Sequence, residues 1–355
     1  MAGNSDLNSA KSAKKDEFYT QLTDIEKELR HYRQHFKGKT VLCNCDDPFE
    51  SNFFKYFVLN FNRLGLKKLI ATCYTGSPIA NQQLSLFDVL GESVENSEEK
   101  PYKAVVTTVY DKTGDGGVDM LDVAELFKSG ENELTELKGD GDFRSPECLA
   151  LMKEADIVVT NPPFSLFREY VATLVEHNKK FIIIGNLNAV KYKEIFPLFM
   201  ENKIWLGASI HSGDRAFFVP DDYPLEAAGC GVDKETGRKF IRVKGVRWFT
   251  NLDIKQRHEE MILVNHYKTD LYPQFDNYGA INVGKTTDIP CNYPGVMGVP
   301  ITFLDKYNPD QFEIVGELNH GCDNKYDLGK PIINGIEKYP RVLIRNKHPE
   351  QPKEE

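Results

Sequence analysis

The stretch "DIVVTNPPFSLFREYV", from Asp156 to Val171, places a strand-like apolar run directly before two prolines and an amphipathic helix pattern. Proline fixes φ and holds the preceding residue extended, so Asn161 and Pro162 are stiffened where the chain leaves the strand. Open parallel sheets bind ligands at the carboxyl ends of their strands. The tetrapeptide from Asn161 to Phe164 is therefore expected to lie at a ligand site.

The sequence around this stretch alternates strand and helix patterns. Buried strands are indicated by "KTVLCNC", "KKLIATCY", "DIVVT" and "KKFIIIGN". Helices are indicated by "SNFFKYFVLNFNRLG", which ends at Gly65, and by "SPECLALMKEA" and "SLFREYVATLVEH". An earlier helix has Leu22, Ile25, Leu29 and Tyr32 on one face. This order predicts an α/β fold with a parallel sheet covered by helices.

Composition divides the chain into segments. Residues 1–15 are small, polar and basic, which is typical of a disordered tail. We expect residues 16–255 to form one domain, interrupted over 75–139 by a polar insertion that holds the strand "YKAVVTTVY". After Ile204 the pattern changes to shorter β-like runs, and residues 256–355 are expected to form a C-terminal region.

Charge and cysteine content limit the class of protein. The net charge of −9 comes entirely from residues 91–142, because the remainder has 39 acidic and 39 basic side chains. No apolar run of about 18 residues and no charged-then-apolar leader is present, so we expect a cytoplasmic protein without a membrane span. Seven cysteines without paired Cys/His spacing indicate reduced thiols and no metal site.

The residues from Asn161 to Phe164 suit chemistry on a planar amine. The Asn161 side-chain oxygen and the Pro162 carbonyl can both accept hydrogen bonds from one –NH2 group, while Phe164 offers a face for stacking. An amine held in this way is pushed toward tetrahedral geometry, which localises its lone pair and makes it a better nucleophile. The structural alternative is a helix entry in which Ser165 is the N-cap.

Several stretches, including "DEFYTQ", "CNCDDP", "GDGDFRS" and "DIVVTNPPFSLFREY", resemble the EcoRI-type adenine-specific DNA methyltransferase family from Asp16 to about Lys347. The resemblance implies a class I S-adenosylmethionine-dependent methyltransferase fold, Rossmann-like and mainly parallel, with a C-terminal target-recognition region. It also implies site-specific transfer of the S-adenosyl-L-methionine methyl group to N6 of a flipped-out adenine in double-stranded DNA, in a restriction-modification or an orphan system.

The resemblance implies roles residue by residue. The catalytic motif is Asn161, Pro162, Pro163 and Phe164. The residues implied to bind the cofactor are Asn161, Phe18, Tyr19, Thr20, Asp47, Pro48, Phe49, Asp142 and Phe143. Ser51 and Phe53 stand where the family usually has glycines, and the second strand lacks the usual ribose-binding acid, with Cys73 and Tyr74 at its end.

DNA contacts are expected from basic residues after the catalytic motif: Arg215, Arg238, Lys239, Arg242, Lys244 and Arg247. A solvated strand face explains the same pattern, and the sequence does not separate base contacts from phosphate contacts. Phe217 or Phe218 could stack on the extruded adenine, although such rings are more often core. "YPQFDNYGAIN", from Tyr272 to Asn282, is better explained as an ordinary surface connection than as a DNA-facing loop.

Two other functions fit the same residues. Asn-Pro-Pro-Phe also serves methyltransferases that act on RNA bases or on a protein glutamine amide, but the N-terminal "FYTQ" and the long C-terminal region favour DNA. A DNA-binding module without catalysis would explain the missing glycines but not the intact tetrapeptide. We expect a monomer whose cognate restriction endonuclease, if one exists, acts on the same site without forming a stable complex.

Overall fold

The computed structural model describes residues 20–45, 51–73, 101–219, 229–234, 236–319 and 325–351. The chain divides into two compact units. The first unit comprises Met1–Asn186 and Ser212–Leu252, and the second comprises Leu187–His211 and Asp253–Glu355. The later boundary lies close to the expected one at residue 255, but Leu187–His211 groups with the second unit. The expected tail, residues 1–15, lies outside the described residues.

The first unit contains a mixed sheet. Its central strands are β2 (Lys68–Thr72), β1 (Thr40–Cys43), β5 (Ile157–Thr160) and β6 (Lys180–Asn186). These four are parallel in the order β2-β1-β5-β6. Antiparallel strands flank them: β3 (Tyr102–Val106) beside β2, β4 (Glu133–Glu136) beside β3, and β11 (Val246–Thr250) beside β6. The expectation of a mainly parallel sheet therefore holds only for its centre.

The expected insertion extends this sheet. β3 pairs antiparallel with β2, and alternate residues of β3 are buried, so the strand packs like the rest of the sheet. The segment between β3 and β4 contains α7 (Met120–Lys128), whose N-cap Asp119 forms a capping box with Asp122. Residues 101–139 therefore extend the main sheet, while residues 74–100 lie outside the described part.

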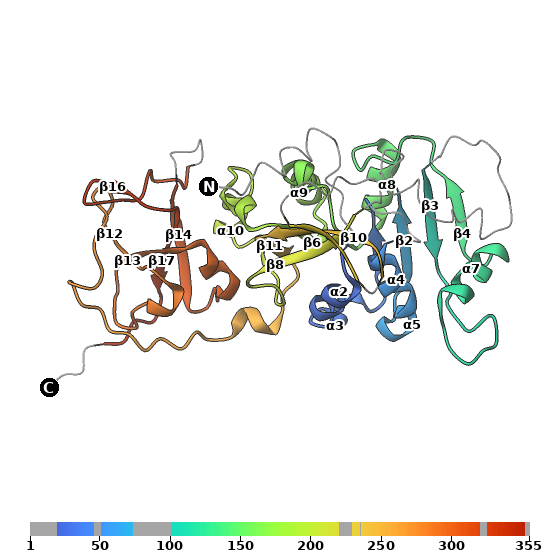
Figure 1. Ribbon diagram of the computed structural model, residues 1–355, viewed down its shortest axis with the longest axis horizontal. Helices are drawn as coiled ribbons and strands as arrows, with labels where there is room; N and C mark the ends of the chain where they lie inside the picture. The colour runs from blue at the N-terminus through green and yellow to red at the C-terminus, as the bar shows by residue number, and fades with distance from the viewer. Residues whose placement is uncertain are drawn as a thin grey trace. The chain divides into compact units, whose positions relative to one another are not determined.

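Helices cover both faces of the sheet (Figure 1). One face carries α2 (Leu22–Leu29), α3 (Arg33–Phe36), α4 (Asn52–Leu59) and α5 (Phe61–Leu64), and the other carries α8 (Pro146–Glu154) and α9 (Phe167–Glu176). The predicted apolar face of the first helix is confirmed in part: Ile25 and Leu29 are fully buried, Leu22 is half-buried, and Tyr32 is buried but lies beyond the end of α2. Gly65 ends α5 with a left-handed φ of 63°, which glycine adopts without strain.

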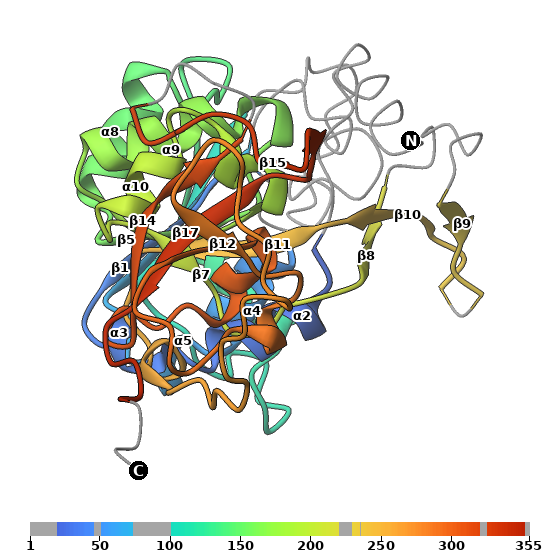
Figure 2. The ribbon, with the colours of Figure 1, turned by 90° about the vertical axis from the view of Figure 1, so that its left-hand side faces the viewer.

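A three-stranded antiparallel sheet is attached to the main sheet. It comprises β8 (Asp214–Phe218), β10 (Lys239–Lys244) and β9 (Cys230–Val232) in the order β8-β10-β9. Figure 2 shows β10 and β11 as an almost continuous ribbon that carries β8 and β9 away from the helices. Gly245, which separates β10 from β11, has a positive φ of 74° that allows the change of direction.

The second unit is built on β-strands, as the sequence after Ile204 predicts. Its four-stranded sheet has the order β12 (Ala280–Asn282), β13 (Val296–Pro300), β17 (Arg341–Asn346) and β14 (Phe312–Leu318). The shorter elements are α10 (Phe196–Met200), β7 (Trp205–Leu206), β15 (Ile332–Ile333) and β16 (Ile336–Glu337). A core cluster joins Phe275, Ala280, Leu318, Ile333 and Leu343. Across the described residues of both units, no helix is long and apolar enough to span a membrane.

Gly185 in β6 allows α9 to pack closely on the sheet. A Cβ atom at this position would lie 2.5 Å from a Phe167 ring atom and 2.9 Å from a Phe249 ring atom. We predict that Gly185→Ala lowers the free energy of unfolding by about 1–3 kcal/mol, because overpacking forces the rings apart. Urea unfolding measures this, with Gly139→Ala as the control, since no atom lies within 4 Å of that Cβ. Equal effects of the two substitutions would contradict the packing argument.

Candidate active site

The tetrapeptide from Asn161 to Phe164 lies at the carboxyl end of β5. Asn161 is 5% exposed and Pro162 is buried, whereas Pro163 and Phe164 are half-buried. A short 3-10 turn, Phe164–Leu166, follows and leads directly into α9. The sequence therefore places a buried carboxamide and a partly exposed ring at one strand end.

The explanation of this stretch as a helix entry capped by Ser165 is wrong. The N-cap of α9 is Leu166, and no side chain caps that helix. The N–H of Leu166 instead donates to the Pro163 carbonyl at 3.0 Å. The backbone turn, rather than a capping side chain, thus connects the prolines to α9.

Asn44, which follows β1, joins three elements at this end of the sheet. Its carbonyl accepts a hydrogen bond from the Thr160 hydroxyl at the end of β5, and its side-chain oxygen accepts one from the Tyr170 hydroxyl on α9. All three residues are buried. Burial raises the pKa of Tyr170 well above its ordinary value, so its hydroxyl stays protonated and can donate. The end of β1, the residue before Asn161 and α9 are therefore held together.

Phe143 and Asp142 lie next to this network. The Phe143 ring packs edge-on against Tyr170, with ring centroids 4.9 Å apart. The Asp142 carboxylate pairs with Arg144 at 2.6 Å, and Arg144 also pairs with Glu169 on α9 at 2.9 Å. The hydrogen bond from Arg144 lowers the pKa of Asp142, which keeps this carboxylate charged at neutral pH. The structure thus brings the predicted "GDF" motif to α9, on the same side as Asn44.

Thr20 is the one member of the predicted N-terminal cofactor motif among the described residues. Its carbonyl accepts a hydrogen bond from the Asn52 side chain at the start of α4, at 2.7 Å. Its hydroxyl is buried and has no hydrogen-bond partner within the described part of the chain. The other residues predicted for the cofactor, Phe18, Tyr19, Asp47, Pro48 and Phe49, lie outside the described residues.

The two residues that replace the usual glycines have structural roles. The Ser51 hydroxyl caps α4 by accepting from the N–H groups of Phe53 and Phe54, at 3.2 and 3.5 Å. The Phe53 ring is buried and packs edge-on against Trp248, with centroids 6.0 Å apart. Cys73 is buried as well, and its sulfur accepts from the Tyr102 N–H. Tyr74 is outside the described residues.

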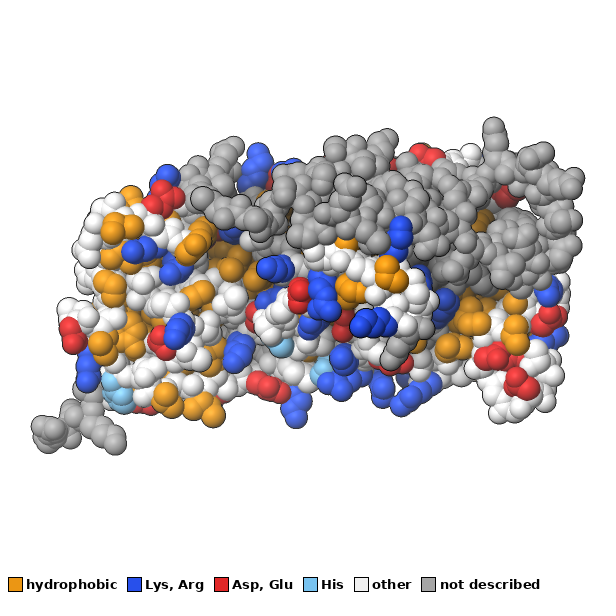
Figure 3. Space-filling model, viewed as in Figure 1, with side chains coloured by type: hydrophobic (Ala, Val, Ile, Leu, Met, Phe, Trp, Pro, Cys, Tyr) orange, Lys and Arg blue, Asp and Glu red, His pale blue; other side chains and the backbone are white. Residues whose placement is uncertain are grey.

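The predicted DNA-contacting residues fall into two groups. In β10, Arg242 and Lys244 are exposed and alternate with the buried Ile241 and Val243, so both project from one face. Arg215, Arg238 and Lys239 are half-buried on the same three-stranded sheet. On the side of the molecule seen in Figure 3, Lys and Arg side chains gather over α2, α3 and β10. We call Arg238, Arg242 and Lys244 the basic surface of β8 and β10, whereas Lys239, and Arg215 opposite Val243, lie on the other face of this sheet.

Arg247 does not belong to this basic surface. It is 3% exposed in β11, and its guanidinium donates to the Val246 carbonyl at 2.8 Å. The spacing of basic residues in the sequence could not show this, because the strand turns inward after Gly245 and becomes fully buried.

The aromatic candidates also separate by burial. Phe217 is 2% exposed and belongs to the core, whereas Phe218 is half-buried under Arg238, whose guanidinium lies 4.5 Å from the ring centroid. Tyr272 and Phe275 are buried, and Ala280–Asn282 forms β12. The segment from Tyr272 to Asn282 thus contributes core residues and a strand to the second unit, so the preferred interpretation of "YPQFDNYGAIN" as an ordinary surface connection is wrong.

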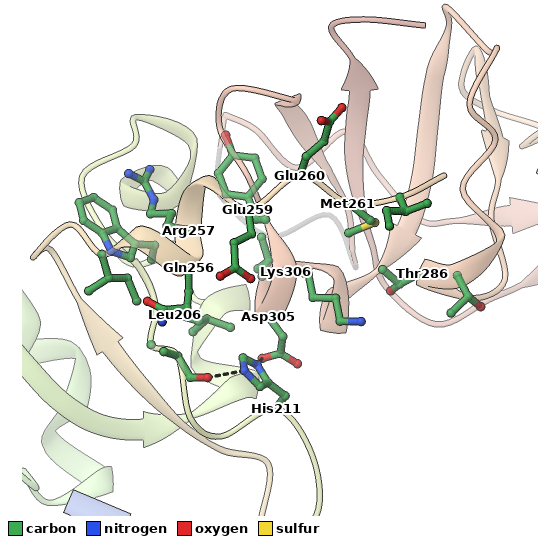
Figure 4. Close-up of a pocket in the computed structure, with 18 of the residues that line it drawn as sticks. Leu206, His211, Gln256, Arg257, Glu259, Glu260, Met261, Thr286, Asp305 and Lys306 are labelled. Carbon is green, nitrogen blue, oxygen red and sulfur yellow. Dashed lines mark hydrogen bonds and ion pairs between the residues drawn. The ribbon is translucent and has the colours of Figure 1, made fainter. Parts of the chain in front are cut away.

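The second unit contains a pocket of about 700 Å³ (Figure 4). It is lined by Trp205, Leu206, His211, Gln256, Arg257, Glu259, Glu260, Asp305 and Lys306, among others. The Arg257 guanidinium lies 3.8 Å from the centroid of a Trp205 ring, which is a cation–π contact. Carboxylates and cations are mixed around it, so the pocket differs in charge from the basic surface of β8 and β10.

Sequence reasoning missed Asn44 and Tyr170, which organise the site. A polar residue at the end of a buried strand is a usable signal, because strand ends face the ligand crevice. Tyr170 gives no such signal, since it has the spacing of an ordinary core residue on α9. A mixed α/β sheet that carries Asn-Pro-Pro-Phe at a central strand end defines a methyltransferase of planar amino groups.

Comparison with known proteins gives the family. Residues 6–347 match the family described as "Adenine-specific methyltransferase EcoRI". The chain is 46% identical over 348 residues to the Type II methyltransferase M.EcoRI of Escherichia coli, covering 98% of both chains. It is also 38% identical over 312 residues to the Type II methyltransferase M.MpnI of Mycoplasma pneumoniae, covering 87% of this chain and 84% of that protein.

A further relative is the Type II methyltransferase M.MgeORF184P of Mycoplasma genitalium, which is 36% identical over 358 residues and covers 96% of this chain and 98% of that protein. The chain belongs to the EcoRI adenine-specific methyltransferase family. It is a site-specific, adenine-specific DNA methyltransferase of the kind found in restriction-modification. The family implies a methyl donor.

Proposed function

We propose that the first unit is a class I methyltransferase domain that binds S-adenosyl-L-methionine at the carboxyl ends of β1 and β5. The observation that carries this proposal is the Asn44 network, which fixes the buried Asn161 beside the end of β1. The buried Thr20 hydroxyl, without a partner among the described residues, is a group that a cofactor bound near the start of α4 would satisfy. When bound, the cofactor supplies a methyl group already activated on a sulfonium sulfur.

The residues of the tetrapeptide hold the reacting amine. The Asn161 side-chain oxygen and the Pro162 carbonyl accept from the two N6–H groups, which directs the nitrogen lone pair away from them. Phe164, which is half-buried at the carboxyl end of β5, stacks on the adenine ring. The adenine must leave the duplex to reach this position, and stacking on Phe164 offsets part of the unstacking cost of a few kcal/mol. The amine loses a proton only after transfer, so the site needs no strong general base.

The basic surface of β8 and β10 holds the DNA backbone in this proposal. Arg242 and Lys244 project from one strand face, and alternate residues of a strand lie about 7 Å apart, close to the spacing of successive phosphates. Since these residues are exposed, they can bind phosphate without a large desolvation cost. Arg247 is not among the proposed DNA-contacting residues, because its side chain is buried.

The second unit is proposed as the target-recognition region. It is an independent compact unit with its own core, and its pocket contains Gln256 and Glu259, residue types that bind adenine and cytosine edges. The enzyme is proposed to act as a monomer on one strand at a time. Any cognate endonuclease would recognise the same sequence without a stable complex.

Removing the carboxamide tests the proposed role of Asn161. We predict that Asn161→Ala lowers the single-turnover rate of methyl transfer by about a hundredfold or more, because a preorganised partner of the reacting group is lost. Transfer of label from S-adenosyl-L-methionine to duplex DNA measures the rate, and calorimetry measures cofactor binding. Ser165→Ala, four residues along the same turn, should keep most of the rate. A rate for Asn161→Ala equal to that of the control would contradict the proposed mechanism.

Charge removal tests the proposed DNA surface. Arg242→Ala and Lys244→Ala should each weaken DNA binding to all sequences alike and reduce the slope of log K against log salt by about 1, as expected for one lost phosphate contact. Fluorescence anisotropy at several salt concentrations measures both quantities. Lys67→Ala is the control, because Lys67 is exposed at the amino end of β2, opposite the site. A slope unchanged from the wild type in both strand variants would remove this surface from the interface.

A further inference from the structure

Three side chains of different chemical classes meet in the second unit. His266, Cys291 and Glu350 place a ring nitrogen, a thiol sulfur and a carboxylate oxygen within 4.8 Å of one another. They come from three segments far apart in the sequence, so no short sequence motif predicts that they meet. Cys291 is 4% exposed, while the side chains of His266 and Glu350 are 62% and 60% exposed. The Cys291 thiol is therefore buried in the protein, whereas the His266 ring and the Glu350 carboxylate face solvent.

Backbone hydrogen bonds fix the three segments to each other. The Cys291 N–H donates to the Asn265 carbonyl at 2.8 Å, next to His266. The Glu350 N–H donates to the Cys291 carbonyl at 2.9 Å. The Tyr267 N–H donates to the Asn292 side chain at 2.7 Å. The backbone of each of the three residues is thus held near Cys291, directly or through a chain neighbour, so a ligand would have to order only the His266 and Glu350 side chains.

The spacing of the donor atoms suits one small cation. His266 Nε2 lies 3.7 Å from Glu350 Oε2. Two ligands at Zn–N and Zn–O distances of about 2.0–2.1 Å in a tetrahedral site lie about 3.3 Å apart, so a rotation of two exposed side chains closes the difference. Thiolate, imidazole and carboxylate are all zinc ligands, whereas a thiolate disfavours Ca²⁺ and Mg²⁺.

We propose that His266, Cys291 and Glu350 form a Zn²⁺ site with three protein ligands and one water, which fastens the segment after β17 to the second unit. Such a site is separate from methyl transfer and does not depend on the function proposed above.

The acidic loop of Asp111, Asp115 and Asp122 is the other group of possible ligands among the described residues. It offers only carboxylate oxygens, and Asp122 already accepts from the N–H groups of Lys112, Thr113 and Asp119. This loop cannot produce a thiolate signal. An absorption band from a metal–thiolate bond therefore shows that the metal is bound at Cys291, and a bound metal without this band would lie at the acidic loop.

The test uses the full-length protein, freed of metal with a chelator and titrated with Co²⁺ and then with Zn²⁺. We expect one Co²⁺ per chain with a thiolate-to-metal charge-transfer band, and loss of this band when Zn²⁺ is added. Cys291→Ser should abolish the band, while Cys230→Ser, at a half-buried cysteine in β9 of the first unit, should keep it. His266→Ala and Glu350→Gln, at exposed positions where folding is not at risk, should each weaken Zn²⁺ binding at least tenfold.

Thermal unfolding gives a second readout that does not depend on activity. Zn²⁺ that binds only the folded protein raises the midpoint of unfolding in the wild type and in Cys230→Ser, and raises it less in His266→Ala at the same Zn²⁺ concentration. The absence of a thiolate band in the wild type would overturn the proposal. So would an unchanged band in Cys291→Ser, or Zn²⁺ affinity in His266→Ala equal to that of the wild type.

Discussion

The hydrogen bonds to Asn44 are the interaction on which the site depends. One residue after β1 accepts from Thr160 at the end of β5 and from Tyr170 on α9, and all of these groups are buried. Losing one partner would leave a buried polar group unsatisfied, which costs about 1–3 kcal/mol. The two strand ends and α9 are consequently held in one arrangement, and Asn161, the next residue after Thr160, is positioned by it.

The two residues at the positions where glycines were expected have structural roles at α4. Ser51 uses its hydroxyl to cap α4, and Phe53 adds a ring to the core against Trp248. Both residues stabilise the amino end of α4 at the cost of the close backbone approach that glycines allow. The packing of Phe53 against Trp248 and the Asn44 network together fix the ends of the central strands around Asn161.

Much of the first unit followed from the sequence, because hydrophobic periodicity and punctuation by Gly and Pro are local signals. The four central strands, the helices around them and the position of Asn161 were predicted in this way. Pairing between distant segments was not: the antiparallel β3 and β4 resembled an insertion, and Arg247 resembled its exposed neighbours. The grouping of Leu187–His211 with the second unit and the meeting of His266, Cys291 and Glu350 also depend on tertiary contacts.

A double-mutant cycle with Asn44→Ala and Tyr170→Phe tests the central claim most directly. The free energy of unfolding and the single-turnover rate of methyl transfer would be measured for both single variants, the double variant and the wild type. If Asn44 and Tyr170 act as one unit that positions Asn161, their effects on both quantities are non-additive by about 0.5–3 kcal/mol. Additive effects on the rate, with each variant folded and binding cofactor normally, would show that the network does not organise the active site.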